Sequence, residues 1–257
     1  MQTASASGEE FRNDLRPLAA LPASAAPGGI GSGNAAARRT LSGAELAPLT
    51  ELNDLRSLAS VAVTAGVIAL AVGFGVAVWP SAWLALSVLV IGVQQHAMFV
   101  LAHEAAHYRL FSLRALNDGV GRLIGMASGI SMCTYRVIHR LHHNHLYTEE
   151  DPDTAIHGGY PRGVGYLWKK LAQDLLGLNA WKTFAYFFGA PAINVQTKRA
   201  ARPLDDTSAA LRASARSDRW AVLAFQLGAP VVAYALGGWA ALALYLLLWL
   251  LPMLTVL

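Results

Sequence analysis

The chain has 257 residues, and only 14% of them are charged, against about 25% in an average soluble domain. Apolar residues make up 54% and the mean hydropathy is positive, which excludes an ordinary soluble protein and favours a membrane protein. The net charge of +4 predicts no nucleic-acid partner, because the basic residues fall in the polar segments where membrane topology places them.

The first segment of the chain, residues 1–43, is rich in Ala, Ser, Gly and Pro and has no hydrophobic periodicity. We therefore predict that it is disordered. It carries acidic residues and no apolar core, so it resembles neither a secretory signal nor an organellar transit peptide. Residues 44–56 follow as a predicted amphipathic helix at the membrane surface, with Ser42 as a candidate N-cap.

Four apolar segments dominate the rest of the chain, each long enough or nearly long enough to span a bilayer core of about 30 Å. They are residues 58–79, 83–102, 221–237 and 239–257. Short uncharged turns at Pro80-Ser81 and Gly237-Gly238 join them in pairs, which predicts two transmembrane hairpins. The predicted membrane domain, residues 57–257, comprises a hairpin at 57–102, a cap at 103–219 and a truncated hairpin at 220–257.

The distribution of basic residues predicts the orientation. Five of the 20 Lys and Arg residues lie in residues 1–56 and fifteen in residues 103–219, so the positive-inside rule places both regions in the cytoplasm. Cys133 is the only cysteine, which fits a reducing compartment. The Ala-rich composition suits a bacterial inner membrane. The expected fold is an all-α, multi-pass membrane protein with four transmembrane helices and a cytoplasmic helical cap.

Within the cap, we predict helices over residues 122–143 and 164–188, followed by a loop and a short helix over residues 189–218. Four arginines in the cap are candidates for contact with a lipid headgroup or an acidic electron donor. They are Arg109, Arg114, Arg136 and Arg140.

All eight histidines fall between His96 and His157, and seven of them form two groups. The groups are His96, His103 and His107, and then His139, His142, His143 and His145. Neutral imidazole is a good ligand for Fe, Zn, Cu and Ni, and such clustering is hard to explain by packing. The pattern therefore indicates a metal site.

The spacing within the groups selects five candidate ligands. His103 and His107 are i and i+4 on one helical face, and His139, His142 and His143 are i, i+3 and i+4 on another. Five histidines exceed the three protein ligands of a typical catalytic zinc, which favours two metals. We interpret His96 as a hydrogen-bonded interior residue, His145 as turned away and His157 as a solvated loop residue.

Two other functions fit parts of this pattern. The segment His103-Glu104-Ala105-Ala106-His107 matches the H-E-x-x-H helix of zinc proteases, in which Glu104 would be the general base of an intramembrane protease. That interpretation leaves the second histidine group without a role. A metal transporter would need ionisable groups in several spans, whereas only the second predicted span contains one, His96.

The segments H-E-A-A-H at the end of the second predicted span, H-R-L-H-H about thirty residues later and the following D-P-D resemble the membrane fatty acid desaturase family. The resemblance in layout covers roughly residues 58–257. It implies a cytoplasmic cap that holds two irons through histidines, with metal ligands His103, His107, His139, His142 and His143.

The resemblance also implies a reaction: O2-dependent desaturation of a fatty acyl chain, carried by a lipid or by coenzyme A. The electrons would come from a ferredoxin, rubredoxin or cytochrome b5-type donor. Hydroxylation or ketolation of a lipid or carotenoid by the same superfamily is the alternative. Glu104 is the candidate catalytic residue, and Asp151 and Asp153 are further candidates that would orient imidazoles through their outer N–H groups.

One expected feature is missing. The family places a third box, H-x-x-H-H, after the fourth span, whereas this chain has no histidine after His157 and ends in apolar sequence. We interpret the sequence as a C-terminally incomplete member, and we expect the chain alone to be inactive because the predicted ligands cannot complete a diiron centre.

Overall fold

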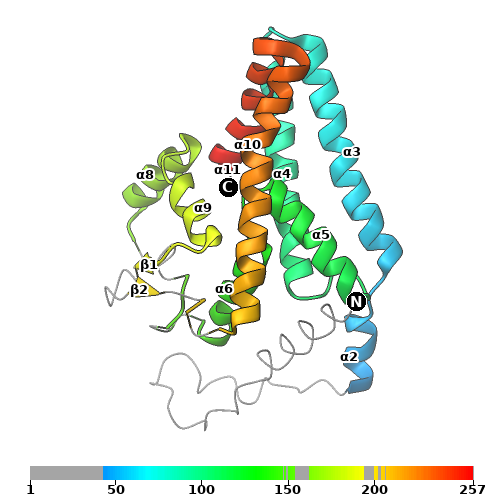
Figure 1. Ribbon diagram of the computed structural model, residues 1–257, viewed down its shortest axis with the longest axis vertical. Coiled ribbons are helices and arrows are strands. Elements are labelled where there is room, and N and C mark those ends of the chain that lie inside the picture. The colour runs from blue at the N-terminus through cyan, green and yellow to red at the C-terminus, as the bar shows by residue number, and fades with distance from the viewer. Residues whose placement is uncertain are drawn as a thin grey trace. The chain divides into compact units, whose positions relative to one another are not determined.

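The computed structural model describes residues 43–146, 148, 150–153, 162–193, 200–201, 204–205 and 207–256. The chain divides into two compact units, Met1–Asn53 and Asp54–Leu257. The described part is helical apart from one antiparallel pair of two-residue strands (Figure 1), so the all-α prediction is confirmed in outline. Nearly all of the segment predicted to be disordered, residues 1–42, lies outside the described part.

The first unit contributes one described helix, α2 (Gly43–Thr50). It is shorter than the surface helix predicted over residues 44–56, because the chain leaves helical geometry at residues 51–53 and a new helix begins at Asp54. An acidic residue in the first turn is favoured by the helix dipole, which makes Asp54 a suitable first residue.

Among the described residues, three helical segments are long and apolar enough to cross a membrane. They are α3 (Asp54–Val78), α4 (Leu84–Ala106) and the helical segment Ala209–Thr255. α3 and α4 pack along each other. Only 17% and 22% of their most apolar windows are buried, so lipid must cover most of their apolar surface. α4 continues past the predicted span to Ala106, which places His103 in its last turn.

The third spanning segment is interrupted where a turn was predicted. α10 (Ala209–Tyr245) has non-helical backbone angles at Gly237 and Gly238, and Gly238 has a φ of +61°, which favours glycine. In Figure 1 the orange ribbon of α10 turns near its upper end. The π-helical turn η1 (Leu246–Leu250) and α11 (Leu251–Val256) follow and pack against α4.

The prediction of one continuous helix over residues 122–143 is wrong. The structure has two helices here, α5 (Arg114–Ala127) and α6 (Met132–Asn144). Gly129 turns the chain with a φ of +76°, and the side chain of Ser131 caps α6 by accepting a hydrogen bond from the backbone N of Thr134. The turn allows α6 to contact both α4 and α9.

The helix predicted over residues 164–188 is also divided, into α8 (Val164–Leu175) and α9 (Ala180–Phe188). Gly177, with a φ of +69°, lies between them. Strands β1 (Ala192–Ile193) and β2 (Ala200–Ala201) follow. The short separate helix predicted before residue 218 is absent from the described part of this region, because α10 begins at Ala209 and runs on into the third spanning segment.

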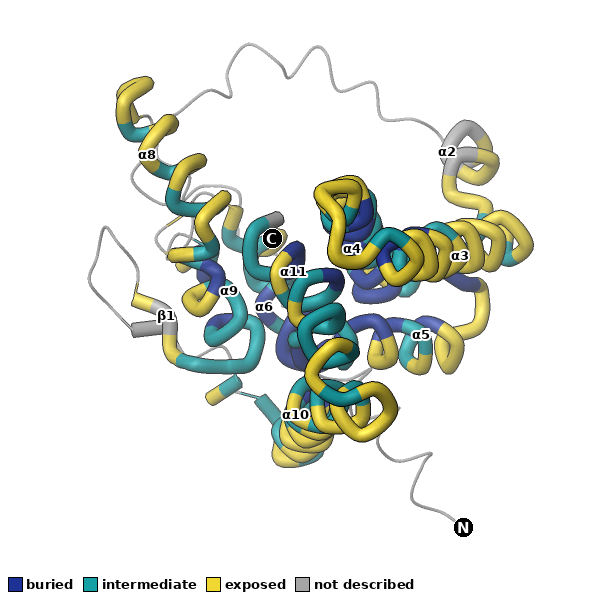
Figure 2. Tube along the Cα trace, turned by 90° about the horizontal axis from the view of Figure 1, so that it is seen from above, coloured by how far each residue is buried: buried dark blue, intermediate teal, exposed yellow. Residues whose placement is uncertain are grey.

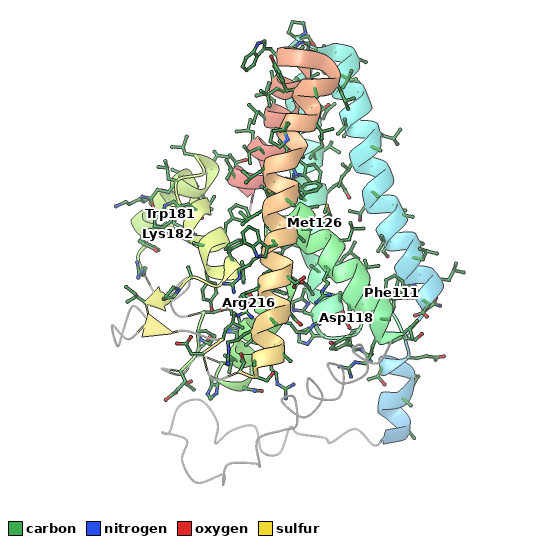
Figure 3. All side chains as sticks on the ribbon, in the orientation of Figure 1. Phe111, Asp118, Met126, Trp181, Lys182 and Arg216 are labelled. Carbon is green, nitrogen blue, oxygen red and sulfur yellow. The ribbon has the colours of Figure 1, made fainter. Side chains whose placement is uncertain are left out.

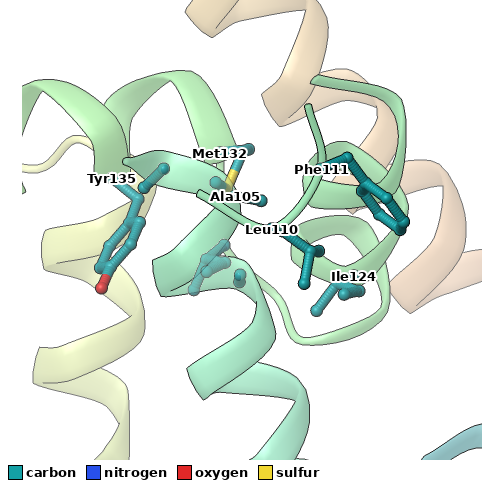
Figure 4. Close-up of a cluster of buried hydrophobic side chains, with 9 residues drawn as sticks. Ala105, Leu110, Phe111, Ile124, Met132 and Tyr135 are labelled. Carbon is teal, nitrogen blue, oxygen red and sulfur yellow. The ribbon is translucent and has the colours of Figure 1, made fainter. Parts of the chain in front are cut away.

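The main core lies where α4, α5 and α6 meet (Figures 2 and 4). Its buried side chains are Ala102, Ala105, Ala106, Leu110, Phe111, Ile124, Ile130, Met132 and Tyr135. Small residues allow the close approach, since a Cβ at Gly121 of α5 would lie 3.2 Å from the Cβ of Ala105. Because Ala105 and Ala106 lie between His103 and His107, this core also fixes the end of α4 that carries the first histidines.

Candidate metal centre

The first group of candidate ligands combines histidines from two helices. His103 lies in the last turn of α4 and His107 caps that helix, while His139 and His143 lie one turn apart on α6. One ligand atom from each of the four side chains lies within 4.8 Å of the others. The two i, i+4 pairs predicted on separate helices therefore meet, and we call these residues the four-histidine group.

His139 is the shared contact of the four-histidine group. Its Nε2 lies 2.8 Å from Nε2 of His107 and 3.0 Å from Nε2 of His143. A ring nitrogen of neutral imidazole either donates one hydrogen or accepts one, so this Nε2 cannot satisfy both contacts by hydrogen bonding. Nitrogen ligands about 2.1 Å from one ion lie roughly 3 Å apart. The three nitrogens are therefore spaced as ligands of a common ion.

The protonation of the four-histidine group suits metal binding. Burial, reinforced by the neighbouring rings of His103 and His107, lowers the pKa of His139 to about 3. Burial is also the first cause that lowers the pKa of His107, followed by its neighbours His103 and His143. Both rings are therefore neutral at neutral pH, and the neutral form of imidazole is the one that binds a metal.

Glu104 lies next to the four-histidine group and contacts His103. Its Oε1 is 3.1 Å from Nδ1 of His103. A carboxylate that accepts a hydrogen bond from Nδ1 fixes the ring and leaves Nε2 free to bind a metal. The contact therefore has the geometry that an orienting role for Glu104 requires.

His142 is separated from the other candidate ligands on α6. Its Nδ1 lies 2.9 Å from Oδ1 of Asp151 and 3.5 Å from Oδ2 of Asp153. Residues 142 and 143 are about 100° apart around a helix, so their rings point to different neighbours. The helix predicted over residues 139–143 is confirmed, but the structure places its three histidines in two groups rather than one.

The second group, which we call the His142–aspartate group, consists of His142, Asp151 and Asp153. Oδ1 of the buried Asp151 also accepts a hydrogen bond from the backbone N of Asp153, at 2.9 Å. Tyr186 of α9 donates its hydroxyl to Oδ1 of Asp153, at 2.9 Å. Burial, followed by the charge of Asp153, raises the pKa of Tyr186, so the phenol remains protonated and able to donate.

The remaining histidines lie outside both groups. His96 is exposed on α4, so its interpretation as an interior residue is wrong. His145 follows α6, and its backbone N donates to Leu141 O and His142 O. His157 lies outside the described residues.

An aromatic cluster supports His139 from the side of α9. Tyr135 stacks on the His139 ring with centroids 5.3 Å apart and planes 9° from parallel. Phe99 of α4 and Phe187 of α9 pack against Tyr135 with centroid distances of 5.6 and 5.2 Å. Such packing restricts the His139 ring and excludes water from one of its faces.

Arg136 joins α6 to the end of α4. Its Nη2 donates to the backbone O of Ala105 at 3.2 Å, and its Nη1 donates to Oδ1 of Asp118 at 2.7 Å. Its guanidinium also lies 4.3 Å from the ring centroid of Tyr108, which Arg114 contacts at 3.9 Å. Tyr108 has a φ of +57°, unusual for a side chain of this size, directly after His107.

The predicted contact with a headgroup or an electron donor is therefore wrong for Arg136, whose side chain is 11% exposed. Its interactions instead hold Ala105, which lies between His103 and His107, and Tyr108, which directly follows His107.

We expect the substitution Arg136→Met to lower the free energy of unfolding by about 2 kcal/mol. It removes the buried guanidinium group, and the carbonyl of Ala105 loses one of its hydrogen-bond donors. Metal affinity should fall with it. SDS titration of the detergent-solubilised protein measures the stability. Arg136→Lys keeps the positive charge but not the two-pronged guanidinium geometry, so its free energy of unfolding should fall by less. Wild-type stability and metal content in Arg136→Met would contradict this role.

The loop between α4 and α5 is fixed by one buried amide. Oδ1 of Asn117 accepts from the backbone N of Leu110 and of Phe111, each at 3.1 Å. Its Nδ2 donates to the backbone O of Phe111 at 2.7 Å and of Leu113 at 3.0 Å. All four hydrogen bonds hold the backbone that follows His107.

Sequence reasoning missed the roles of Arg136, Asn117 and Tyr186. Asn117 stands in Asn117-Asp118-Gly119, which reads as an exposed turn from its composition alone. Arg136 was visible only as one of many positive charges, and Tyr186 only as part of an aromatic helix. Arg136 and Tyr186 contact segments distant in the sequence, which residue spacing does not reveal, whereas Asn117 bonds to a nearby irregular loop that has no periodic pattern.

The model of the family described as "Fatty acid desaturase" matches residues 77–257, which include both histidine groups and the second and third spanning segments. No curated protein matches the chain.

Proposed function

The chain belongs to the fatty acid desaturase family, and from this premise we propose that it is an O2-dependent desaturase of fatty acyl chains. Membership identifies it as a membrane protein of lipid metabolism with oxidoreductase activity. The observation that carries the specific proposal is the geometry of the four-histidine group. In it, Nε2 of His139 lies 2.8 Å from Nε2 of His107 and 3.0 Å from Nε2 of His143.

We propose that the four-histidine group would hold one iron and that His142, oriented by Asp151, would contribute one ligand to a second iron. The two hydrogen bonds accepted by Oδ1 of Asp151 support an orienting role for this carboxylate. Bound iron supplies the redox change and O2 activation that removal of hydrogen from an unactivated methylene needs, and that zinc cannot provide. Overall, the acyl chain loses two hydrogens, while O2, two external electrons and two protons form two waters.

The protein side chains hold this centre in three ways. Glu104 would keep the His103 ring oriented by accepting from Nδ1, and Asp151 would do the same for His142. The packing of Tyr135, Phe99 and Phe187 would exclude water beside His139. Tyr186 would hold Asp153 through its hydroxyl.

We further propose that the third spanning segment crosses the membrane twice, which gives four spans in two hairpins. The non-helical backbone at Gly237-Gly238 supports this arrangement, and so does the packing of η1 and α11 against α4. The histidine groups and the N-terminus would then lie in the cytoplasm of a bacterial cell, where a ferredoxin, rubredoxin or cytochrome b5-type donor would supply electrons.

Mass spectrometry of the products tests the proposed reaction. The purified protein, loaded with iron and supplied with O2, a reducing system and a panel of acyl lipids and acyl thioesters, should give products lighter by two hydrogens if the two histidine groups suffice for activity. Absence of any oxidised product would instead agree with the expectation that these ligands alone cannot complete a diiron centre. Products heavier by one oxygen would identify a hydroxylase instead. Peptide cleavage with bound zinc would contradict an oxidative function altogether and restore the intramembrane protease.

Substitution of Glu104 separates an orienting carboxylate from a general base. We expect Glu104→Gln to lower turnover and iron affinity by about 10-fold to 100-fold, because loss of an outer hydrogen-bond partner weakens ligation without removing a ligand. Iron titration and turnover measure the two effects, with Glu104→Asp as the partial substitution. Complete loss of turnover at full iron occupancy would contradict an orienting role and indicate direct proton transfer by Glu104.

A further inference from the structure

The surface of α8 is apolar on its exposed side and polar on its half-buried side. At 100° per residue, five apolar residues fall within an arc of about 100°. They are exposed to the following extents: Val164 70%, Leu167 49%, Trp168 68%, Leu171 48% and Leu175 71%. Figure 2 shows α8 without a buried residue.

Three polar residues of α8 lie on its more buried side, whereas Lys169 is exposed. Lys170, Gln173 and Asp174 are half-buried. Lys170 pairs with Asp174, which also accepts a hydrogen bond from Nδ2 of Asn179 at 3.0 Å and so fixes the turn between α8 and α9. A helix on a water-exposed surface has the opposite arrangement, with its apolar stripe turned toward the core.

The exposed apolar surface continues beyond α8. Leu176, Leu178 and Trp181 are 70%, 57% and 65% exposed. Basic residues border this surface, since Lys169 of α8 and Lys182 of α9 are both exposed (Figure 3 labels Trp181 and Lys182). Tryptophans beside lysines on an apolar stripe are typical of helices that lie in a membrane interface.

The position of α8 in the fold connects this surface to the membrane. α8 contacts α11, which ends the third spanning segment. At the turn after α8, a Cβ on Gly177 would lie 3.2 Å from the backbone O of Leu254, so the two backbones are close. The exposed face of α8 thus continues the surface of a spanning segment whose most apolar window is only 6% buried.

From these observations we propose that α8 and the start of α9 lie in the membrane interface, with the apolar face in the acyl region and Lys169 and Lys182 near anionic headgroups. The occupant of this face is the lipid bilayer, not another protein. This inference is independent of the proposed reaction. Because α9 also carries Tyr186 and Phe187, the interface would set the depth of the His142–aspartate group.

Site-directed spin labelling tests this placement. Leu171→Cys on the apolar face and Lys169→Cys on the polar face each introduce one cysteine. The two positions are exposed on the same helix and form a matched pair. The native Cys133 should remain unlabelled, because burial raises the pKa of its thiol to about 12; the unsubstituted protein serves as the labelling control. The labelled proteins are reconstituted into nanodiscs that contain anionic lipid.

We expect the ratio of oxygen to nickel-chelate collisions to be several-fold higher at position 171 than at position 169, because oxygen concentrates in the acyl region and the chelate stays in water. Equal access of the chelate to both positions would overturn the proposal and show a water-facing surface. Low access of both agents at position 171, with dipolar broadening between labels, would also overturn it and identify a second copy of the chain as the occupant.

Discussion

Replacing His139 with alanine should abolish iron binding by the four-histidine group and reduce acyl oxidation by at least about 100-fold. The His139 ring contacts all three other members, with centroid distances of 4.5 Å to His103, 4.8 Å to His107 and 4.5 Å to His143, and its Nε2 is the atom shared by the two shortest nitrogen contacts. Its removal takes away one ligand and two of the ring contacts between α4 and α6. Elemental analysis of the purified protein and product mass spectrometry measure the two losses.

The matched control for this experiment is His96→Ala. It removes the same side chain from an exposed position on α4, outside both histidine groups, and should leave iron content and turnover unchanged. Loss of only one of two irons in His139→Ala would support separate assignment of the two groups. Retention of full iron content would contradict the proposed centre.

Replacing Asn117 with leucine should lower the free energy of unfolding by about 4 kcal/mol. The leucine leaves three backbone groups of the α4–α5 loop unsatisfied, the N–H groups of Leu110 and Phe111 and the carbonyl of Phe111, and each such buried group costs about 1–3 kcal/mol. The carbonyl of Leu113 also loses a donor but still accepts from two backbone N–H groups. Asn117 is fully buried, so water cannot replace the lost hydrogen bonds without a change in packing. SDS titration of the detergent-solubilised protein, followed by circular dichroism, measures the change.

Two comparison variants sharpen this test. Asn117→Asp keeps the acceptor and loses both donated hydrogen bonds, so it should also be strongly destabilised. Asn144→Leu changes an exposed asparagine at the end of α6 and should stay within about 0.5 kcal/mol of the wild type. Equal stability of Asn117→Leu and Asn144→Leu would show that the loop does not depend on the amide.

The sequence was most informative where the pattern is local. Helical spacing alone predicted that His103 and His107 share a face, and that His139 and His143 do, because i and i+4 positions coincide on any α-helix. Apolar length and the absence of charge predicted the spanning segments for the same reason. The structure adds that the two pairs meet, which depends on how α4 and α6 pack.

Two helix predictions were wrong where a single residue changes the chain direction. Gly129 and Gly177 have positive φ values and divide two segments that were predicted as continuous helices. Apolar periodicity runs through both positions, so it gave no sign of a break. The separation of His142 from His143 was missed for another reason: Asp151 lies beyond the end of α6, and its contact with His142 depends on the fold of the following loop.

The turns at residues 79–83 and at Gly237-Gly238 carry no Lys, Arg, Asp or Glu. A charged residue at the centre of a membrane helix costs about 2.5–3.5 kcal/mol during insertion. Neither turn would impose that cost if it crossed the bilayer during biosynthesis. The charged residues of α10 all lie before its apolar part, at Arg212, Arg216, Asp218 and Arg219. Insertion of either apolar pair would therefore proceed on hydrophobicity alone, with no ionised side chain to translocate.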